Sequence, residues 1–372
     1  MIPVNRPRLD GNEKRYVLEC IESGWISSEG RFIAEFERHF ARKVGRRHAI
    51  AVNSGTGALD AALASLNLSP GDEVIIPAFT IICCASAVLR AGATPVLADS
   101  DPQTWNMDVS EVRSRMTPRT RAIMVVHIYG LPVDMDPIVE LAREHNLMII
   151  EDAAEAIGLR YKGQWCGSFG DISAVSFYAN KHVTTGEGGM IFTDNDELAE
   201  RCRRFRNLCF IPPRRFVHEE LGWNLRMCNI QAAIGLAQLE RLDESIELKR
   251  WIGQYYQRLL ADIAQIQLPV DTLDYAENVY WVFGIVIKED VPLDAEELAK
   301  ELAGLGVQTR PFFWPMHEQP VLKAMGLFKG EAYPVAERIA RKGLYLPCGL
   351  GLTEPEIIEV SNAVHRVFSL RA

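Results

Sequence analysis

The first two-thirds of the chain alternates short apolar runs with amphipathic stretches, and this alternation restricts the possible folds more than any other feature. Seven runs have the length and composition of strands: residues 48–52, 73–76, 94–98, 122–127, 148–151, 174–177 and 190–193. Helical patterns lie between many of them, such as 57–66 and 137–145. Strands that alternate with helices predict a mainly parallel sheet with helices on both faces. The near-continuous apolar run 123–126 fits a sheet that is buried on both sides.

The pattern changes after the seventh strand. Residues 229–248 have the spacing of one long amphipathic helix. The remainder mixes helical patterns at 250–263, 295–305, 334–342 and 354–369 with strand-like or extended runs at 280–287 and 307–313. A chain of 372 residues exceeds the usual ~100–200 residues of one domain. We therefore predict an α/β protein with a large domain at 1–249 and a smaller α+β domain at 250–372.

Charge and composition narrow the function class. The chain has 40 basic and 49 acidic residues, and a net charge of −9 argues against broad binding to nucleic acid or to an anionic membrane. The start of the chain lacks the pattern of a signal peptide, and the longest uncharged run, 74–89, falls short of the ~20 residues that span a bilayer. The eight cysteines form no CxxC pair, so we expect reduced thiols, no metal site and a cytoplasmic enzyme.

Two charged residues stand at the ends of apolar strands. Lys181 follows an uncharged, strand-like run and precedes the glycine-rich segment 185–189. A lysine held against a packed sheet is partly desolvated, which lowers its pKa and lets the neutral amine form a Schiff base. Asp152 ends the strand 148–152 and could keep a pyridine nitrogen protonated. This pair is what pyridoxal phosphate (PLP) requires. Taken singly, Lys181 could be a solvated loop lysine and Asp152 a helix cap.

Three further positions fit the same cofactor. Ser54, Gly55 and Thr56 open an alanine-rich helix after a strand, and a helix N-terminus with hydroxyl groups binds phosphate well. A simple N-cap is the commoner explanation of such a segment. Ser176 could add a hydroxyl, and Glu155 could approach the cofactor ring, although each in isolation is more often structural or at the surface. The ordered combination of phosphate loop, acid and lysine is a stronger signal than any single member.

Several segments together carry a family resemblance: residues 23–28, 54–56, 71–77, 151–156, 176–189, 222–227 and 231–233. Over essentially its whole length the chain resembles the DegT/DnrJ-type sugar-nucleotide aminotransferases. These enzymes have the type I PLP-dependent transferase fold, that of aspartate aminotransferase. The resemblance implies a mainly parallel seven-stranded sheet flanked by helices, with a smaller C-terminal α+β domain.

The resemblance also implies roles for individual residues. Lys181 would form the Schiff base and carry the migrating proton, and Asp152 would pair with the pyridine nitrogen. The implied cofactor contacts are Ser54, Gly55, Thr56, Phe79, Asp152, Glu155, Ser176, Lys181 and Asn224. Asn224 would reach the phosphate from the other subunit, which makes the protein a homodimer with shared active sites. Trp25, Arg226 and His317 would contact the sugar nucleotide.

The chain departs from the family pattern in two places. Ile81 occupies the position after Thr80 where family members often carry the aromatic residue that stacks on the cofactor, so Phe79 or another aromatic side chain would have to replace it. Residues 207–210 replace a glycine-rich stretch near the sugar site. The second departure leaves the substrate open, whereas the cofactor assignment does not depend on it.

Within the family, segments 8–13, 126–130 and 309–317, together with Glu155, resemble the members that convert GDP-4-keto-6-deoxymannose to GDP-perosamine. This implies transfer of the amino group of L-glutamate to the 4-keto carbon, for an O-antigen or another surface glycan. The same chemistry on a dTDP- or UDP-linked keto sugar, a cyclitol ketone or a small keto phosphate remains an alternative. A PLP-dependent sugar dehydratase is disfavoured because the related dehydratases have histidine in place of Lys181. A non-catalytic regulatory protein of the same fold is the remaining alternative.

Overall fold

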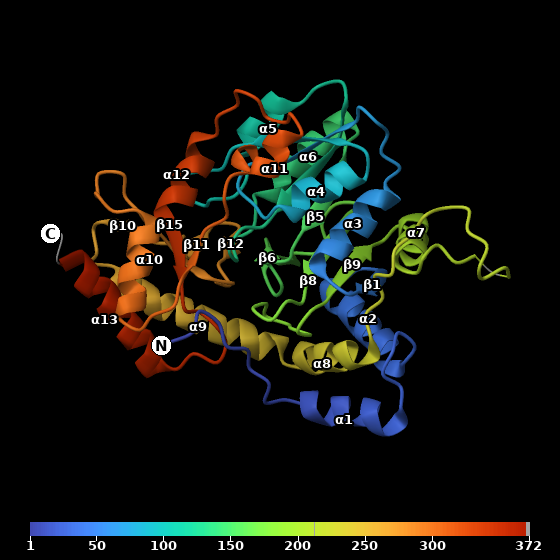
Figure 1. Cartoon of the computed structure of the whole chain (residues 1–372), viewed down its shortest axis with the longest axis horizontal. Helices are drawn as coiled ribbons and strands as arrows, with labels where there is room; N and C mark the ends of the chain where they lie inside the picture. The colour runs from blue at the N-terminus through green and yellow to red at the C-terminus, as the bar shows by residue number, and fades with distance from the viewer. Residues whose placement is uncertain (212, 370–372) are drawn as a thin grey trace.

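The computed structural model describes residues 1–211 and 213–369, and a seven-stranded sheet forms its centre (Figure 1). The strands are β1 His48–Val52, β2 Glu73–Pro77, β3 Thr94–Ala98, β4 Thr120–Val126, β5 Met148–Asp152, β8 Ile172–Ser176 and β9 Gly189–Thr193. Their order is β1-β9-β8-β5-β4-β2-β3. The pairings β2–β3, β2–β4, β4–β5 and β5–β8 are parallel, and β9 runs antiparallel to both neighbours. The predicted seven-stranded, mainly parallel sheet is therefore confirmed.

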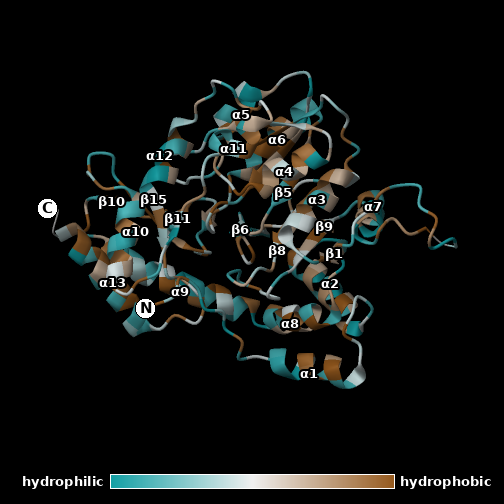
Figure 2. Ribbon diagram, viewed as in Figure 1, coloured by the Kyte–Doolittle hydropathy of each residue, from teal (hydrophilic) through white to brown (hydrophobic). Residues whose placement is uncertain are grey.

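Helices cover both faces because strand residues alternate between two apolar clusters. Ile50 and Val52 of β1 join the cluster that contains α3 (Gly55–Ser65) and α4 (Cys83–Arg90), whereas Ala49 and Ala51 join the cluster of the opposite face. The second cluster contains residues of α2 (Arg31–Val44), α6 (Met135–His145) and α8 (Asn229–Glu240). The helices α1 (Glu13–Ser23), α5 (Val109–Arg115) and α7 (Asp196–Arg206) complete this part. In Figure 2 the inner helix α4 is coloured as hydrophobic, while much of α12 at the periphery is hydrophilic.

A second sheet is built from the C-terminal third. Its four strands have the order β10 (Ile266–Gln267), β13 (Phe283–Ile287), β15 (Gly343–Leu346) and β14 (Arg310–Pro311). A third apolar cluster joins this sheet to α9 (Leu242–Leu260), α10 (Ala295–Gly304) and α13 (Glu354–Ser369). The remaining elements are α11 (Pro320–Ala324), α12 (Pro334–Lys342), the 3-10 helix η1 (Met316–Glu318) and two short hairpins, β6 (Arg160–Tyr161) with β7 (Gln164–Trp165) and β11 (Thr272–Leu273) with β12 (Ala276–Glu277).

The predicted helix 229–248 is wrong in one respect, because the structure divides it. Helix α8 ends at Glu240, and α9 begins at Leu242 and continues to Leu260. Arg241 between them leaves helical geometry, with φ −115° and ψ 17°, and its side chain bonds Glu244. Apolar residues keep helical spacing across this position, so periodicity alone could not reveal the break. The proposed domain boundary at 249/250 lies inside α9 and stays a prediction.

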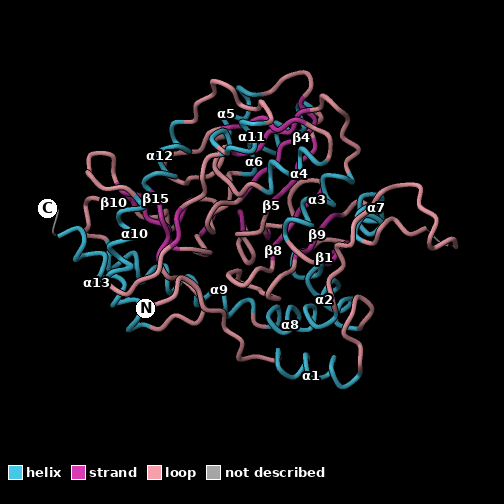
Figure 3. Tube along the Cα trace, in the orientation of Figure 1, coloured by secondary structure: helices cyan, strands magenta, loops and turns pink. Residues whose placement is uncertain are grey.

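The chain between α7 and α8 contains a long irregular segment. Residues 207–211 and 213–224 lie in a loop region that extends from the end of the molecule opposite to the second sheet (Figures 1 and 3). Leu208 and Cys209 have φ of 57° and 52°, so the backbone turns sharply directly after α7. None of the helices within residues 1–211 and 213–369 combines the length and the apolar character that a bilayer crossing requires.

Candidate active site

The carboxyl ends of four strands meet at one cavity of about 360 Å³. β1 leads into Ser54, β2 into Thr80, β5 ends at Asp152 and β8 ends at Ser176, and all four residues line the cavity. β1 shares the direction of the parallel strands because it and β8 are both antiparallel to β9. Open α/β sheets bind ligands beyond the carboxyl ends of their strands. The strand arrangement itself therefore makes this edge the candidate site.

Most of the predicted site residues meet in this cavity. Those that line it are Ser54, Gly55, Thr56, Asp152, Glu155, Ser176 and Lys181. They come from three segments that are far apart in the chain. Lys181 and Asp152 thus face the same cavity, which the PLP hypothesis requires.

Lys181 is largely removed from solvent. Its side chain is 9% exposed, and its Nζ lies 3.9 Å from Glu155 Oε1 and 3.5 Å from the centroid of the Trp281 ring. Burial lowers the pKa of Lys181, and the negative charges of Glu155 and Asp152 oppose this effect. The indole ring of Trp281 also donates through Nε1 to the carbonyl of Asn180, at 3.0 Å, and so steadies the turn that carries the lysine. Sequence reasoning missed Trp281, which lies 100 positions beyond Lys181 and carries no local motif.

Asp152 is buried and has few hydrogen-bond donors. Its Oδ1 accepts from the N–H of Ala154 at 3.0 Å, and its Oδ2 accepts from the Cys84 thiol at 3.5 Å. Burial raises the pKa of Asp152, and the Ala154 N–H, the charge of Lys181 and the Cys84 thiol oppose that rise. A thiol is a weak donor, so Oδ2 retains the capacity to accept a stronger bond. The sequence predicts only reduced thiols and does not connect Cys84 with Asp152.

Glu155 is a buried carboxyl group rather than a surface residue. Its Oε2 accepts from the N–H of Tyr129 at 2.9 Å. Burial raises the pKa of Glu155 to about 8, although the charge of Lys181 and the Tyr129 N–H act in the opposite direction. At neutral pH this group therefore mostly holds a proton beside the lysine.

The start of α3 gives the cavity the features of an anion site. Ser54 caps α3 by accepting from the N–H of Gly57 at 3.0 Å, so the cap interpretation of this serine is confirmed. The first N–H groups of a helix have no partner within the helix, and here they lie beside the hydroxyls of Thr56 and Ser176. A Cβ at Gly55 would lie 2.7 Å from Ser176 Cβ, so only glycine allows this close approach of α3 and β8.

Phe79 does not line the cavity, contrary to the stacking role expected for it. Its side chain is fully buried and packs against the rings of Tyr129, Phe312 and Phe313. The two residues that directly follow Phe79, Thr80 and Ile81, line the cavity instead. The aromatic side chains that do line it are Tyr178, Trp281, Phe313 and Tyr345.

The remaining predicted contacts lie elsewhere in the chain. His317 places Nε2 3.0 Å from Glu337 Oε1 and lines a different pocket with Lys323 and Lys329. Trp25 is 57% exposed in a groove beside Phe32. Arg226 donates to Asn207 at 2.6 Å and lines a third pocket, and Asn224 pairs with Asn207 through the backbone. Within one chain, none of these four residues lines the Lys181 cavity.

Comparisons with known proteins agree on one group. The profile of the DegT/DnrJ/EryC1/StrS aminotransferase family matches residues 7–365. The GDP-perosamine synthase of Caulobacter vibrioides is 46% identical over 366 residues, 98% of each chain, and that of Escherichia coli O157:H7 is 42% identical over 99% of each chain. EpsN of Bacillus subtilis (strain 168), provisionally named a pyridoxal phosphate-dependent aminotransferase, is 34% identical over 96% of this chain and 94% of its own. The aminotransferase TlmJ from Streptoalloteichus hindustanus superposes with a TM-score of 0.92 at 30% identity, covering all of both chains.

Proposed function

This chain belongs to the DegT/DnrJ/EryC1/StrS aminotransferase family, and we propose that it uses PLP to aminate a nucleotide-linked keto sugar. The amino group would come from L-glutamate and go to the 4-keto carbon of GDP-4-keto-6-deoxymannose, giving GDP-perosamine. The names of the relatives at 46% and 42% identity support this substrate. The observation that carries the proposal is the presence of a desolvated lysine and a buried aspartate in one cavity at the strand ends.

The residues of the cavity fit PLP by their chemistry. Lys181 offers an amine for the aldehyde, Asp152 offers an under-bonded carboxylate oxygen for a protonated ring nitrogen, and the start of α3 with Thr56 and Ser176 offers donors for a phosphate. When bound, the cofactor supplies a ring that accepts electrons from the substrate carbon. Phe313 and Tyr345, together with Trp281, form the apolar side of the cavity.

Lys181 would move the proton. Burial against Trp281 makes a neutral amine accessible, and a neutral amine can take a proton from a substrate carbon and return it. Glu155, 3.9 Å away and mostly protonated near pH 7, adds little negative charge that would hold Lys181 in its charged form. Asp152 favours its charged state when a cation pairs with it, so the ring nitrogen and Asp152 would stabilise one another.

A second copy of the chain would complete the site. Trp25, Asn224 and Arg226 lie outside the Lys181 cavity of their own chain, as expected if they act on the cavity of a partner subunit. We therefore propose a homodimer with shared active sites. Mixing two inactive variants, Lys181→Ala and Asn224→Ala, tests this arrangement. Random reassortment makes half of the dimers mixed, each with one intact site, so activity should return to about one quarter of wild type. No recovery after verified subunit exchange would refute shared sites.

Borohydride reduction tests the cofactor link. The wild-type protein reduced in the presence of PLP should carry a phosphopyridoxyl group on the peptide that contains Lys181. The variant Lys181→Ala should bind PLP without this adduct and lose turnover, whereas the exposed control Lys162→Ala should retain both. An adduct on another lysine in the wild type would overturn the assignment. The substrate is tested by charging the enzyme with the amino form of the cofactor and adding GDP-, dTDP- and UDP-linked keto sugars: only the true acceptor should restore the aldehyde absorbance.

A further inference from the structure

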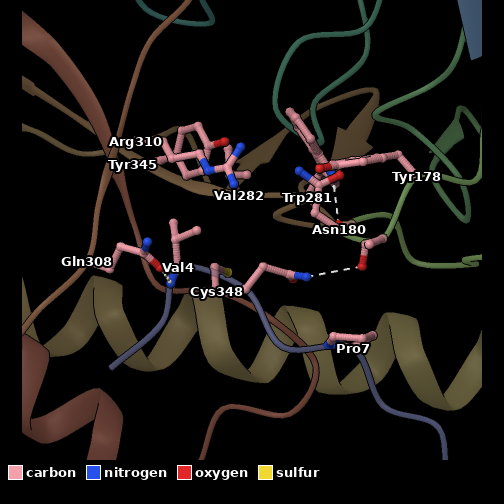
Figure 4. Close-up of a pocket in the computed structure, with 12 residues that line it drawn as sticks. Val4, Pro7, Tyr178, Asn180, Trp281, Val282, Gln308, Arg310, Tyr345 and Cys348 are labelled. Atoms are coloured by element: carbon pink, nitrogen blue, oxygen red, sulfur yellow. Dashed lines mark hydrogen bonds between the residues drawn. The ribbon is translucent and has the colours of Figure 1, made fainter. Parts of the chain in front are cut away.

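A second cavity lies behind the turn that carries Lys181. It measures about 210 Å³ and is enclosed by the N-terminal segment on one side and by Trp281, Arg310 and Tyr345 on the other. Figure 4 shows Cys348 on its wall close to Val4. Pro7, Tyr178 and Arg310 are solvent-exposed members of the lining, so small solutes can enter from outside. Cys348 is itself 3% exposed, and the cavity is therefore its route to solutes.

Lys249 of α9 holds the sulfur from the other side. This lysine is 2% exposed, and no carboxylate bonds its Nζ among the described residues. Its Nζ donates to the carbonyl of Trp281 at 2.9 Å, to the carbonyl of Cys348, and to Cys348 Sγ at 3.1 Å. Burial lowers the pKa of Lys249, which favours the neutral, nucleophilic amine.

We propose that Lys249 and Cys348 form a reversible covalent N–S crosslink when a hydroperoxide oxidises the thiol. In the first step hydrogen peroxide takes two electrons from sulfur, the S–H bond becomes S–OH, and one water leaves. In the second step the Nζ lone pair attacks sulfur, the S–O bond breaks, and the departing hydroxyl leaves as a second water with a proton from the amine. The products are one N–S bond and two waters. A dithiol reductant reverses the reaction by returning two electrons, which restores the amine and the thiol.

The placement of the two groups favours this reaction over further oxidation. An amine already 3.1 Å from sulfur competes as an intramolecular nucleophile, with the high effective concentration that such contact confers. Cys166 provides a comparison within the same molecule. It is also 3% exposed, but it neither lines the second cavity nor has a hydrogen bond from a lysine. Cys348 therefore differs from the equally buried Cys166 in two ways: solutes can reach it through the second cavity, and the Lys249 amine lies beside it.

The crosslink would also reach the Lys181 cavity. Only the ammonium form of Lys249 can donate all three of these bonds; the neutral amine has two N–H groups, enough for both carbonyls, and the crosslinked nitrogen keeps one, so it can no longer donate to both. One of these carbonyls belongs to Trp281, whose ring lies 3.5 Å from Lys181 Nζ. Oxidation at residue 348 is thereby coupled to the surroundings of Lys181, whatever substrate the enzyme uses.

Mass spectrometry of the full-length protein tests the proposal. The protein is treated with hydrogen peroxide, denatured, and digested without reductant by a glutamate-specific protease, which releases peptides 248–277 and 338–356, because the Glu354–Pro355 bond resists cleavage. We expect these peptides joined, with a mass equal to their sum less two hydrogen atoms, and separated again by dithiothreitol. The variants Cys348→Ala and Lys249→Met should lack the joined species, and the Cys166 peptide should stay unattached.

Two results would overturn the proposal. One is a wild-type protein in which Cys348 becomes oxidised while Lys249 stays free, shown by amine labelling after denaturation. The other is a joined pair that is heavier by one oxygen atom, because this mass requires an N–O–S bridge instead. If Lys249→Met does not fold, Cys348→Ala retains the lysine and still separates a specific crosslink from random oxidation.

Discussion

Replacing Glu155 by glutamine should change how stability depends on pH. The pKa of this buried carboxyl group rises from 4.5 to about 8 on folding, and burial is the main cause. Between these values the folded state binds a proton that the unfolded state lacks. The unfolding free energy of the wild type therefore contains a contribution that is complete below about pH 4.5 and is lost as pH rises through about pH 8.

The size of the effect follows from the shift. One pKa unit corresponds to about 1.4 kcal/mol, so the rise of the Glu155 pKa from 4.5 to about 8 sets an upper bound of about 5 kcal/mol. Glutamine stays neutral, and its amide oxygen can accept the same N–H of Tyr129. The cofactor-free variant should therefore gain about 3–5 kcal/mol relative to wild type between about pH 5 and about pH 8.5.

Urea unfolding at a series of pH values measures this difference. Lys181 titrates in both proteins, so the comparison with wild type isolates Glu155 as far as the two groups are independent. Asp136→Asn is a control, because Lys162 lowers the pKa of the exposed Asp136 and keeps it charged across this range. That control should show no new pH slope. A difference between Glu155→Gln and wild type that stays flat, within about 0.5 kcal/mol, would refute the account of Glu155 as a buried acid.

Three further substitutions probe other parts of the structure. Phe79→Ala should lower the unfolding free energy by about 3–5 kcal/mol in urea titrations because the ring is fully buried. The spectrum of bound cofactor should remain unchanged, and a clear spectral shift would place Phe79 at the cofactor after all. Gly130→Ala should destabilise by more than about 1 kcal/mol, since φ is +97° and the new Cβ would lie 2.6 Å from Trp281 N; an unchanged unfolding midpoint would contradict this. Asp152→Asn should reduce turnover by about 100-fold or more while leaving the fold intact by circular dichroism, and near-normal turnover would remove Asp152 from the mechanism.

The strands of the central sheet could be predicted because each one is specified by residues that are adjacent in the sequence. Each strand is a short apolar run between helical patterns, and 48–52 and 94–98 were assigned with the bounds that the structure has. The strand-end residues of the site share this origin: Ser54, Asp152 and Ser176 each stand where an apolar run stops. Parallel strands bring such ends together without any knowledge of tertiary contacts.

The placement of other residues depends on contacts that are not local in the sequence. Phe79 and Ile81 stand two positions apart, and their residue types do not say which of the two faces the cavity. His317 stands in a segment that resembles the family, and its ring bonds Glu337 of α12, so its contact with the substrate stays a prediction. The break at Arg241 coincides with a change of packing partners, from α1 and α2 for α8 to α13 for α9. Each of these outcomes depends on contacts between distant segments, which a single sequence does not specify.

The reactivity of Lys181 itself depends on such distant contacts. The strand-end residues supply charge, but the amine is removed from water by three aromatic side chains of the second sheet. Trp281 precedes β13, Phe313 follows β14, and Tyr345 lies in β15. Without these three aromatic side chains Lys181 would be an ordinary exposed lysine, protonated at neutral pH and unreactive. The amine therefore acquires its chemistry only when the second sheet packs against the first, and Lys249 bonds the Trp281 carbonyl at this junction. It follows that substitutions at the junction should alter the titration of Lys181 even though they touch neither the cofactor nor the substrate.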